Sequence, residues 1–230
     1  PQRFMNLKSV LDETVHAIHS LKARHPVRVG IDGVSASGKT TFADQLVEPL
    51  RKLGRTVIRA SIDGFHNPPE TRYRQGESCP IGYLEDSFDK QAVIENILYP
   101  LGPSGSLNYR DSLFDFVSNR KTQAQLRQSE AEAILIFEGV LLFCDQLAPH
   151  FDFRIFVDTS FDTVIERALK RDRSRLGGKQ STLAKYNQRY IPGQKEYLKR
   201  HAPREQANLV IDNNDYRQPR IIARRPIKQP

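Results

Sequence analysis

The chain has 230 residues and a formal net charge of +8, with 38% hydrophobic and 27% charged residues. This length suits one α/β domain, and no apolar run approaches the roughly 18 residues of a membrane span, so no membrane partner is expected. The two cysteines, Cys79 and Cys144, lack the spacing of a zinc site or a disulfide framework. A reducing, cytoplasmic setting is therefore expected.

The predicted elements alternate between helices and strands. Apolar residues at helical spacing predict a helix within residues 1–25, beginning near Phe4 and ending before Pro26. Apolar runs predict strands at 27–31, 56–62, 133–137, 153–157 and 208–211. Helices are expected over 40–53, 88–98 and 161–176, and a loop over 67–82. This order predicts a doubly wound, mostly parallel sheet of about five strands, within a single domain of residues 1–230 whose core spans 26–212.

The segment Gly33–Thr40 reads GVSASGKT and fits the pattern G-x-x-x-x-G-K-[ST] without a departure. Its glycines allow backbone N–H groups to surround a phosphate, and the next helix adds its positive N-terminus. Lys39 would reach the β- and γ-phosphates of ATP, and the Thr40 hydroxyl would bind Mg²⁺. The ATP-binding residues predicted here are Gly33, Ser35, Ala36, Ser37, Gly38, Lys39, Thr40 and Thr41.

Two acidic residues, Asp63 and Glu138, stand where predicted strands end. Ligands of open α/β sheets bind beyond the carboxyl ends of the strands, so both side chains should face the phosphate loop. Phosphoryl transfer needs a carboxylate for Mg²⁺ and often another that accepts the proton of the attacking hydroxyl. Asp63 suits the catalytic base and is also a metal candidate, whereas Glu138 suits the metal. The alternative for either residue is capping of the following helix.

Arg167, Arg171 and Arg175 are spaced four residues apart, so they would share one face of the predicted helix. One interpretation is a solvated face, partly balanced by neighbouring acidic residues. The other is an arginine-rich lid over about residues 165–180 that neutralises charge on the transferring phosphoryl group, and the phosphate loop favours it. Arg167 and Arg171 are thus expected to be catalytic. The basic tail, residues 213–230, is expected to be solvated: Arg220, Arg224, Arg225 and Lys228.

The motifs GVSASGKTT, SIDGFH, FDFVSNRK, IFEGVLLF, FVDTSFDTVIERALKRD and ANLVIDN occur in this order within residues 27–212. Together they resemble the uridine kinase (uridine–cytidine kinase) family of P-loop kinases, near phosphoribulokinase and pantothenate kinase. The resemblance implies a kinase that uses ATP and Mg²⁺. It also implies that Asp63 is the catalytic Asp beside the nucleoside hydroxyl, Glu138 the Mg²⁺ carboxylate and Arg171 a lid arginine. Arg167 is one residue from another lid arginine of the pattern.

The segments expected to contact the nucleoside depart from this family. The Tyr and His of Y-D-F-V-S-H, which contact the pyrimidine, are replaced by Phe114 and Asn119. Tyr83 stands where a ribose-binding Asp is expected, and a phenol cannot reproduce a carboxylate clamp on two hydroxyls. His66 is a further candidate for substrate contact, although a loop His is more often structural. Uridine and cytidine are therefore expected to be modest substrates.

Three functional hypotheses remain. The first is an ATP-dependent kinase for a hydroxyl of a small molecule, with a nucleoside first and a sugar or pantothenate as alternatives. The second, a GTPase-like switch or another NTP-hydrolysing protein, is disfavoured because no N-K-x-D motif occurs. The third, nucleic-acid binding through the +8 charge, lacks zinc-finger spacing or an RNP motif, so no specific nucleic acid is expected. The chain is a possible homo-oligomer.

Overall fold

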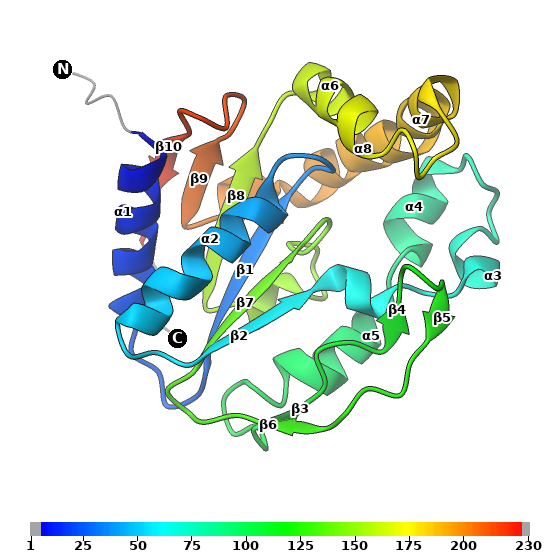
Figure 1. Cartoon of the computed structure of the whole chain (residues 1–230). Helices are drawn as coiled ribbons and strands as arrows, with labels where there is room; N and C mark the ends of the chain where they lie inside the picture. The colour runs from blue at the N-terminus through cyan, green and yellow to red at the C-terminus, as the bar shows by residue number, and fades with distance from the viewer. Residues whose placement is uncertain (1–5, 227–230) are drawn as a thin grey trace.

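A six-stranded sheet forms the centre of the molecule (Figure 1). The structure is a computed structural model and describes residues 6–226, so the predicted helix start at Phe4 and the tail residue Lys228 lie outside the described residues. In spatial order the strands are β10 (Arg220–Arg224), β9 (Leu209–Asp212), β8 (Phe153–Asp158), β1 (Val27–Gly33), β7 (Ile134–Gly139) and β2 (Val57–Ser61). All neighbours are parallel except β10, which is antiparallel to β9.

The predicted fold class is confirmed, and all five predicted strands are present. The sixth strand, β10, corrects the prediction that the tail is simply solvated. Its sequence RIIAR buries Ile221 while Arg220 and Arg224 stay exposed. Arg220 pairs with Asp212 at 2.9 Å, and Arg224 pairs with Glu13 of the first helix. The charged residues of this edge strand give it the composition of a solvated tail. Its pairing with β9 could therefore not be inferred from composition alone.

Helices cover both faces of the sheet. The helices α1 (Leu7–His19) and α2 (Lys39–Lys52) pack their apolar residues against one face, where Val29 and Ile31 of β1 point. On the other face lie α4 (Pro80–Asp86), α5 (Lys90–Val93), a π-helical turn η2 (Ile94–Leu98) and α8 (Ile191–His201). This confirms the doubly wound arrangement, in which side chains alternate between two buried faces.

Several predicted boundaries are wrong. The first helix ends at His19, well before Pro26. The predicted loop at 67–82 contains α3 (Pro69–Arg72) and the start of α4. The predicted helix at 88–98 begins at Lys90, because Asp89 caps it by accepting a bond from Ala92 at 2.9 Å. A short antiparallel hairpin pairs β4 (Phe114–Asp115) with β5 (Arg120–Lys121).

The lid region also differs from its prediction. Helix α6 (Phe161–Arg171) ends five residues earlier than expected, and α7 (Lys179–Lys185), a π-helical η4 (Tyr186–Tyr190) and α8 follow. Gly177 and Gly178 have φ values of 79° and 110°, which are incompatible with a continuous helix. Together with α4, the helices α6 to α8 lie beyond the carboxyl ends of the strands (Figure 1).

The remaining short elements are η1 (Ile62–Phe65), β3 (Asn108–Tyr109), β6 (Arg127–Gln128), η3 (Ala148–His150) and α9 (Pro203–Gln206). Of these, η1 follows directly after β2 and carries Asp63 to the carboxyl end of the sheet. Within residues 6–226, none of the helices is both long and apolar enough to cross a membrane.

Candidate active site

The phosphate loop joins β1 to α2 and curls tightly between them. Ala36 and Gly38 have φ values of 57° and 93°, in the left-handed region. A Cβ at Gly38 would lie 2.5 Å from Nδ2 of Asn213, and a Cβ at Gly33 would lie 2.6 Å from the carbonyl oxygen of Val157. Glycine is therefore required at both positions of the motif, which gives the predicted loop its conformation.

Lys39, the first residue of α2, is buried, and its Nζ donates to the carbonyl of Val34 at 3.3 Å. Burial lowers the pKa of Lys39, and the carboxylates of Glu138 and Asp63 partly oppose this effect. Within the described residues, the buried hydroxyl of Ser37 also has no hydrogen-bond partner. A buried ammonium and an unpaired hydroxyl in such a loop fit the phosphates of a nucleotide.

Thr40 and Glu138 meet at the start of α2. The Thr40 hydroxyl donates to Oε2 of Glu138 at 3.2 Å, and Arg59 approaches Oε1 of Glu138 at 3.5 Å. Residues 6–226 contain no group of three His, Cys, Asp or Glu side chains that could hold a metal by themselves. Mg²⁺ in phosphoryl-transfer sites is held by one or two carboxylates together with substrate phosphates. Thr40 and Glu138 fit a Mg²⁺ site of this kind, in which the protein supplies few of the ligands.

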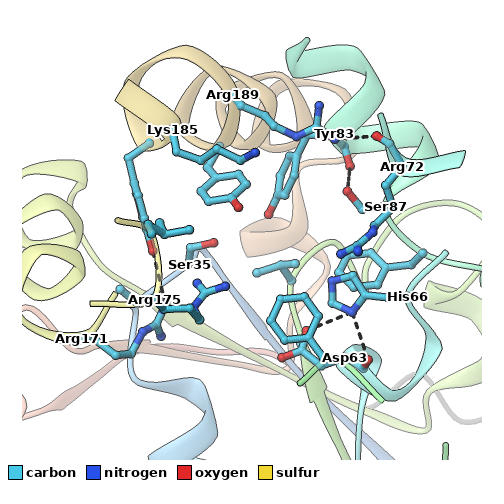
Figure 2. A pocket seen from close by; sticks show the side chains of 18 of the residues that line it. Ser35, Asp63, His66, Arg72, Tyr83, Ser87, Arg171, Arg175, Lys185 and Arg189 are labelled. Carbon is cyan, nitrogen blue, oxygen red and sulfur yellow. Dashed lines mark hydrogen bonds and ion pairs between the residues drawn. The ribbon is translucent and has the colours of Figure 1, made fainter. Parts of the chain in front are cut away.

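A cavity of about 220 Å³ opens beside the loop (Figure 2). It brings together most of the residues predicted to act in the site: Ser35, Ala36, Lys39, Thr40, Asp63, His66, Tyr83, Glu138 and Arg171. The Asp63 side chain is 61% exposed and free to meet a substrate. His66, by contrast, is held between the rings of Phe88 and Phe116, each 4.5 Å away between centroids.

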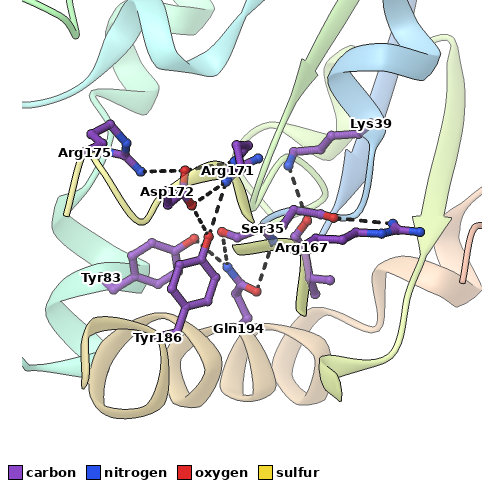
Figure 3. A network of polar contacts seen from close by, with 11 residues as sticks. Ser35, Lys39, Tyr83, Arg167, Arg171, Asp172, Arg175, Tyr186 and Gln194 are labelled. Atoms are coloured by element: carbon purple, nitrogen blue, oxygen red, sulfur yellow. Dashed lines mark hydrogen bonds and ion pairs between the residues drawn. The ribbon is translucent and has the colours of Figure 1, made fainter. Parts of the chain in front are cut away.

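Asp172 organises the arginines of the lid (Figure 3). Arg171 donates two bonds of 2.9 Å to its carboxylate, Arg175 lies 3.3 Å away, and Tyr186 donates a bond of 2.6 Å. Burial acts to raise the pKa of Asp172, but these donors outweigh it and lower the value to about 2. Arg171 and Arg175 both line the cavity, and both pair with the carboxylate of Asp172. The helix that was predicted to align them ends at Arg171.

Arg167 does not line the cavity, in contrast to Arg171. Its guanidinium donates to the carbonyl of Ser37 at 3.1 Å and to that of Asn213 at 2.7 Å. Figure 3 shows it apart from Arg175 and Tyr83. The carbonyl contacts explain this placement, because they hold the side chain against the phosphate loop. Thr41 is also absent from the lining, and it is exposed.

Gln194 of α8 connects the loop to the opposite wall of the cavity. Its Nε2 donates to Oγ of Ser35 at 2.6 Å and to the hydroxyl of Tyr83 at 3.0 Å. The predicted substrate residue Tyr83 therefore lines the cavity. Phe114 and Asn119 do not line it: Phe114 is buried, and Oδ1 of Asn119 accepts a bond from Arg72.

Asp32 lies in β1 directly before the loop and was not singled out from the sequence. Its carboxylate accepts bonds from Gly33 at 2.7 Å, from Phe143 at 3.2 Å and from the hydroxyl of Tyr197. Burial nevertheless dominates these donors and the nearby charge of Lys39, and it raises the pKa of Asp32 to about 6.

The model of the Phosphoribulokinase / Uridine kinase family matches residues 28–217. The chain belongs to this family. It is 29% identical over 197 residues to uridine-cytidine kinase B of Dictyostelium discoideum, covering 82% of this chain and 79% of that protein. Identity to the uridine kinase of Erwinia tasmaniensis is 27% over 199 residues, covering 82% and 92% of the two chains. A possible uridine kinase from Bacillus stearothermophilus shares the fold, with a TM-score of 0.71 at 22% identity over 89% of this chain and 98% of that one.

Family membership makes this chain a P-loop kinase, that is, a phosphotransferase. The cavity of this kinase also contains residues that sequence reasoning did not assign to the catalytic set. These residues are Arg72, Tyr73, Lys185 and Arg189. Their spacing in the sequence carries no motif, because they reach the cavity from α3, α7 and η4.

Proposed function

We propose that this kinase transfers the γ-phosphoryl group of ATP to a hydroxyl of a small molecule, with Asp63 as the base. The observation that carries this proposal is the convergence of Asp63, Lys39, Glu138 and Arg171 on one cavity of about 220 Å³. A nucleotide-hydrolysing switch would need only the phosphate loop and the metal residues. An exposed carboxylate in the cavity instead suits an acceptor hydroxyl.

Each residue would contribute to one displacement at phosphorus. Asp63 accepts the proton of the acceptor hydroxyl, whose oxygen forms a bond to the γ-phosphorus as the bond to the β–γ bridging oxygen breaks and ADP leaves. Lys39 and Arg171 stabilise the negative charge on the phosphoryl oxygens. Thr40 and Glu138 would hold Mg²⁺, which when bound supplies further charge neutralisation on the β- and γ-phosphates.

A nucleoside is the first acceptor class to test, because the named relatives are uridine kinases or uridine-cytidine kinases. Uridine and cytidine themselves should be modest substrates. Tyr83 offers a phenol at the cavity wall, and Phe114 and Asn119 are turned to other partners. Sugars and pantothenate are the alternative acceptors. The cytoplasmic location, homo-oligomerisation and lack of a nucleic-acid partner stay predictions.

The test is a screen with radiolabelled ATP and Mg²⁺ against nucleosides, sugars, sugar phosphates and pantothenate, so that neutral and anionic acceptors are both present. We expect label transfer to at least one compound, and loss of that transfer in Asp63→Asn. Glu48→Gln, which changes an exposed carboxylate of α2 outside the cavity lining, is the matched control. ATP turnover that no acceptor stimulates, and that persists in Asp63→Asn, would support the hydrolase hypothesis instead.

A further inference from the structure

Basic side chains outnumber acidic ones around the cavity. Six lining residues are Lys or Arg, whereas Asp63 and Glu138 are its two acidic residues. The six are Lys39, Arg72, Arg171, Arg175, Lys185 and Arg189. Lys39 lies in the phosphate loop, and Asp172 already pairs with Arg171 and Arg175. Figure 2 shows Arg72 and Arg189 across the cavity from Arg171, so a second group of cations faces the acceptor side.

Arg72 is the most informative member of this second group. It is 93% buried, since its relative exposure is 7%. Within residues 6–226 it forms no ion pair with a carboxylate, and its Nε–H, also buried, has no hydrogen-bond partner. Its guanidinium lies 5.8 Å from the centroid of the Phe116 ring, and that of Arg175 lies 5.5 Å from the same ring. A buried, unpaired cation is costly unless a ligand supplies the anion.

Lys185 and Arg189 are two further cations of this second group, and both lie against the ring of Tyr73. The ammonium of Lys185 lies 4.6 Å from the ring centroid of Tyr73 and 3.5 Å from its hydroxyl. Arg189 is buried, and its guanidinium donates to backbone carbonyls, including those of Gly76 at 3.0 Å and Arg72 at 2.8 Å. Neither side chain forms an ion pair with a carboxylate in the described part of the chain. Hydrogen bonds to carbonyls satisfy the donors of Arg189 but leave its charge without a counterion.

Tyr83 strengthens this imbalance, because it is uncharged. Burial raises the pKa of its phenol, while the hydrogen bonds with Gln194 and Ser35 oppose the rise. The guanidinium of Arg189 lies 6.0 Å from its ring centroid. A carboxylate at this place would neutralise one of the cations, whereas a neutral phenol leaves them available to an anion in the cavity.

We infer that the acceptor carries an oxyanion, a phosphate monoester or a carboxylate, which Arg72 and Lys185 bind while the reactive hydroxyl faces Asp63. This inference rests on the proposed kinase function and favours anionic acceptors over neutral nucleosides. The planar guanidinium of Arg72 at the cavity wall matches the geometry of an oxyanion, and Lys185 adds a point charge. Arg189 contributes its positive charge but no hydrogen bond to the anion, because backbone carbonyls already occupy its donors.

The experiment measures binding of matched probes to the protein saturated with Mg²⁺ and a non-hydrolysable ATP analogue, by isothermal titration calorimetry. D-ribose 5-phosphate is compared with D-ribose, and glycerate with glycerol, so that phosphate and carboxylate are distinguished. At least one anionic probe should bind at least about tenfold more tightly than its neutral partner. Arg72→Gln should remove most of this difference, and Lys185→Gln should reduce it.

Arg173→Gln is the control, because Arg173 is exposed, lies in the lid region and does not line the cavity. It changes the net charge equally and should keep the wild-type difference. Because Arg72 is buried, circular dichroism must show that its variant is folded, and the half-buried Lys185 gives a second test if it is not. Equal affinity for anionic and neutral probes, failure of both anionic probes to bind at millimolar concentration, or an unchanged difference in both variants would overturn the inference.

The same assays separate this inference from the proposed function. Phosphoryl transfer to neutral acceptors, with no preference for anionic ones, would keep the kinase function and reject the anionic acceptor. Selective binding of an anionic probe without transfer to any acceptor would keep the anion site and reject the kinase function.

Discussion

Asp32 should make the folded protein less stable as the pH rises from about 4 to about 7. Its pKa is raised from 3.8 to about 6 in the folded state, so between these values the folded protein binds more protons at this group than the unfolded chain does. The free energy of unfolding therefore falls with pH through this window, and the loss is complete above about pH 7. A shift of about two units corresponds to about 3 kcal/mol.

Urea unfolding of the wild type and of Asp32→Asn, at several pH values in this window, isolates the contribution of this one group. The variant has no proton to lose here, so its free energy of unfolding should fall less than that of the wild type, by about 3 kcal/mol. Asp12→Asn changes an exposed carboxylate on α1 and should follow the wild type. Identical pH dependence of the wild type and Asp32→Asn would refute the reasoning, because the carboxylate would then titrate alike in both states.

Other variants test the catalytic assignments. Lys39→Ala should lower kcat by about 10²-fold or more with an unchanged circular dichroism spectrum, and wild-type turnover would contradict the role of the phosphate loop. Asp63→Asn should lower kcat by about 10²-fold or more at nearly unchanged KM for ATP, whereas Glu138→Gln should raise the Mg²⁺ concentration for half-maximal activity. Wild-type activity of both at low Mg²⁺ would disprove this division. Phe114→Tyr with Asn119→His should change kcat/KM for uridine by less than about tenfold, since neither residue lines the cavity, and a larger gain would place them at the base.

The loop and the strands could be predicted because local sequence determines them. The pattern Gly33–Thr40 requires a particular backbone, and apolar runs such as Ile134–Phe137 are needed in a buried parallel strand. Asp63 and Glu138 followed from the rule that strands of an open sheet deliver their last residues to one edge. These inferences depend on neighbouring residues and on topology, both of which the sequence displays.

The acceptor side could not be predicted in the same way. Arg175 was expected on a helical face, but the helix ends at Arg171, and Asp172 brings Arg175 to the cavity from a turn. Arg72 and Lys185 are 113 residues apart and meet one cavity only through the packing of α3 and α7. The composition shows an excess of basic residues, but it does not show that several of them line the same cavity.

Asn213, close to the C-terminal strand β10, packs against Gly38 and so supports the phosphate loop. The amide of Asn213 donates to the carbonyl of Ser37 at 2.6 Å, and the turn that carries Asn213 is anchored by the pairing of β9 with β10. The rear of the phosphate loop is thus supported by residues about 175 positions later in the sequence. A chain shortened after Asp212 would keep every residue of the motif and yet lose this support. Its affinity for ATP should fall even though all predicted ATP-binding side chains remain.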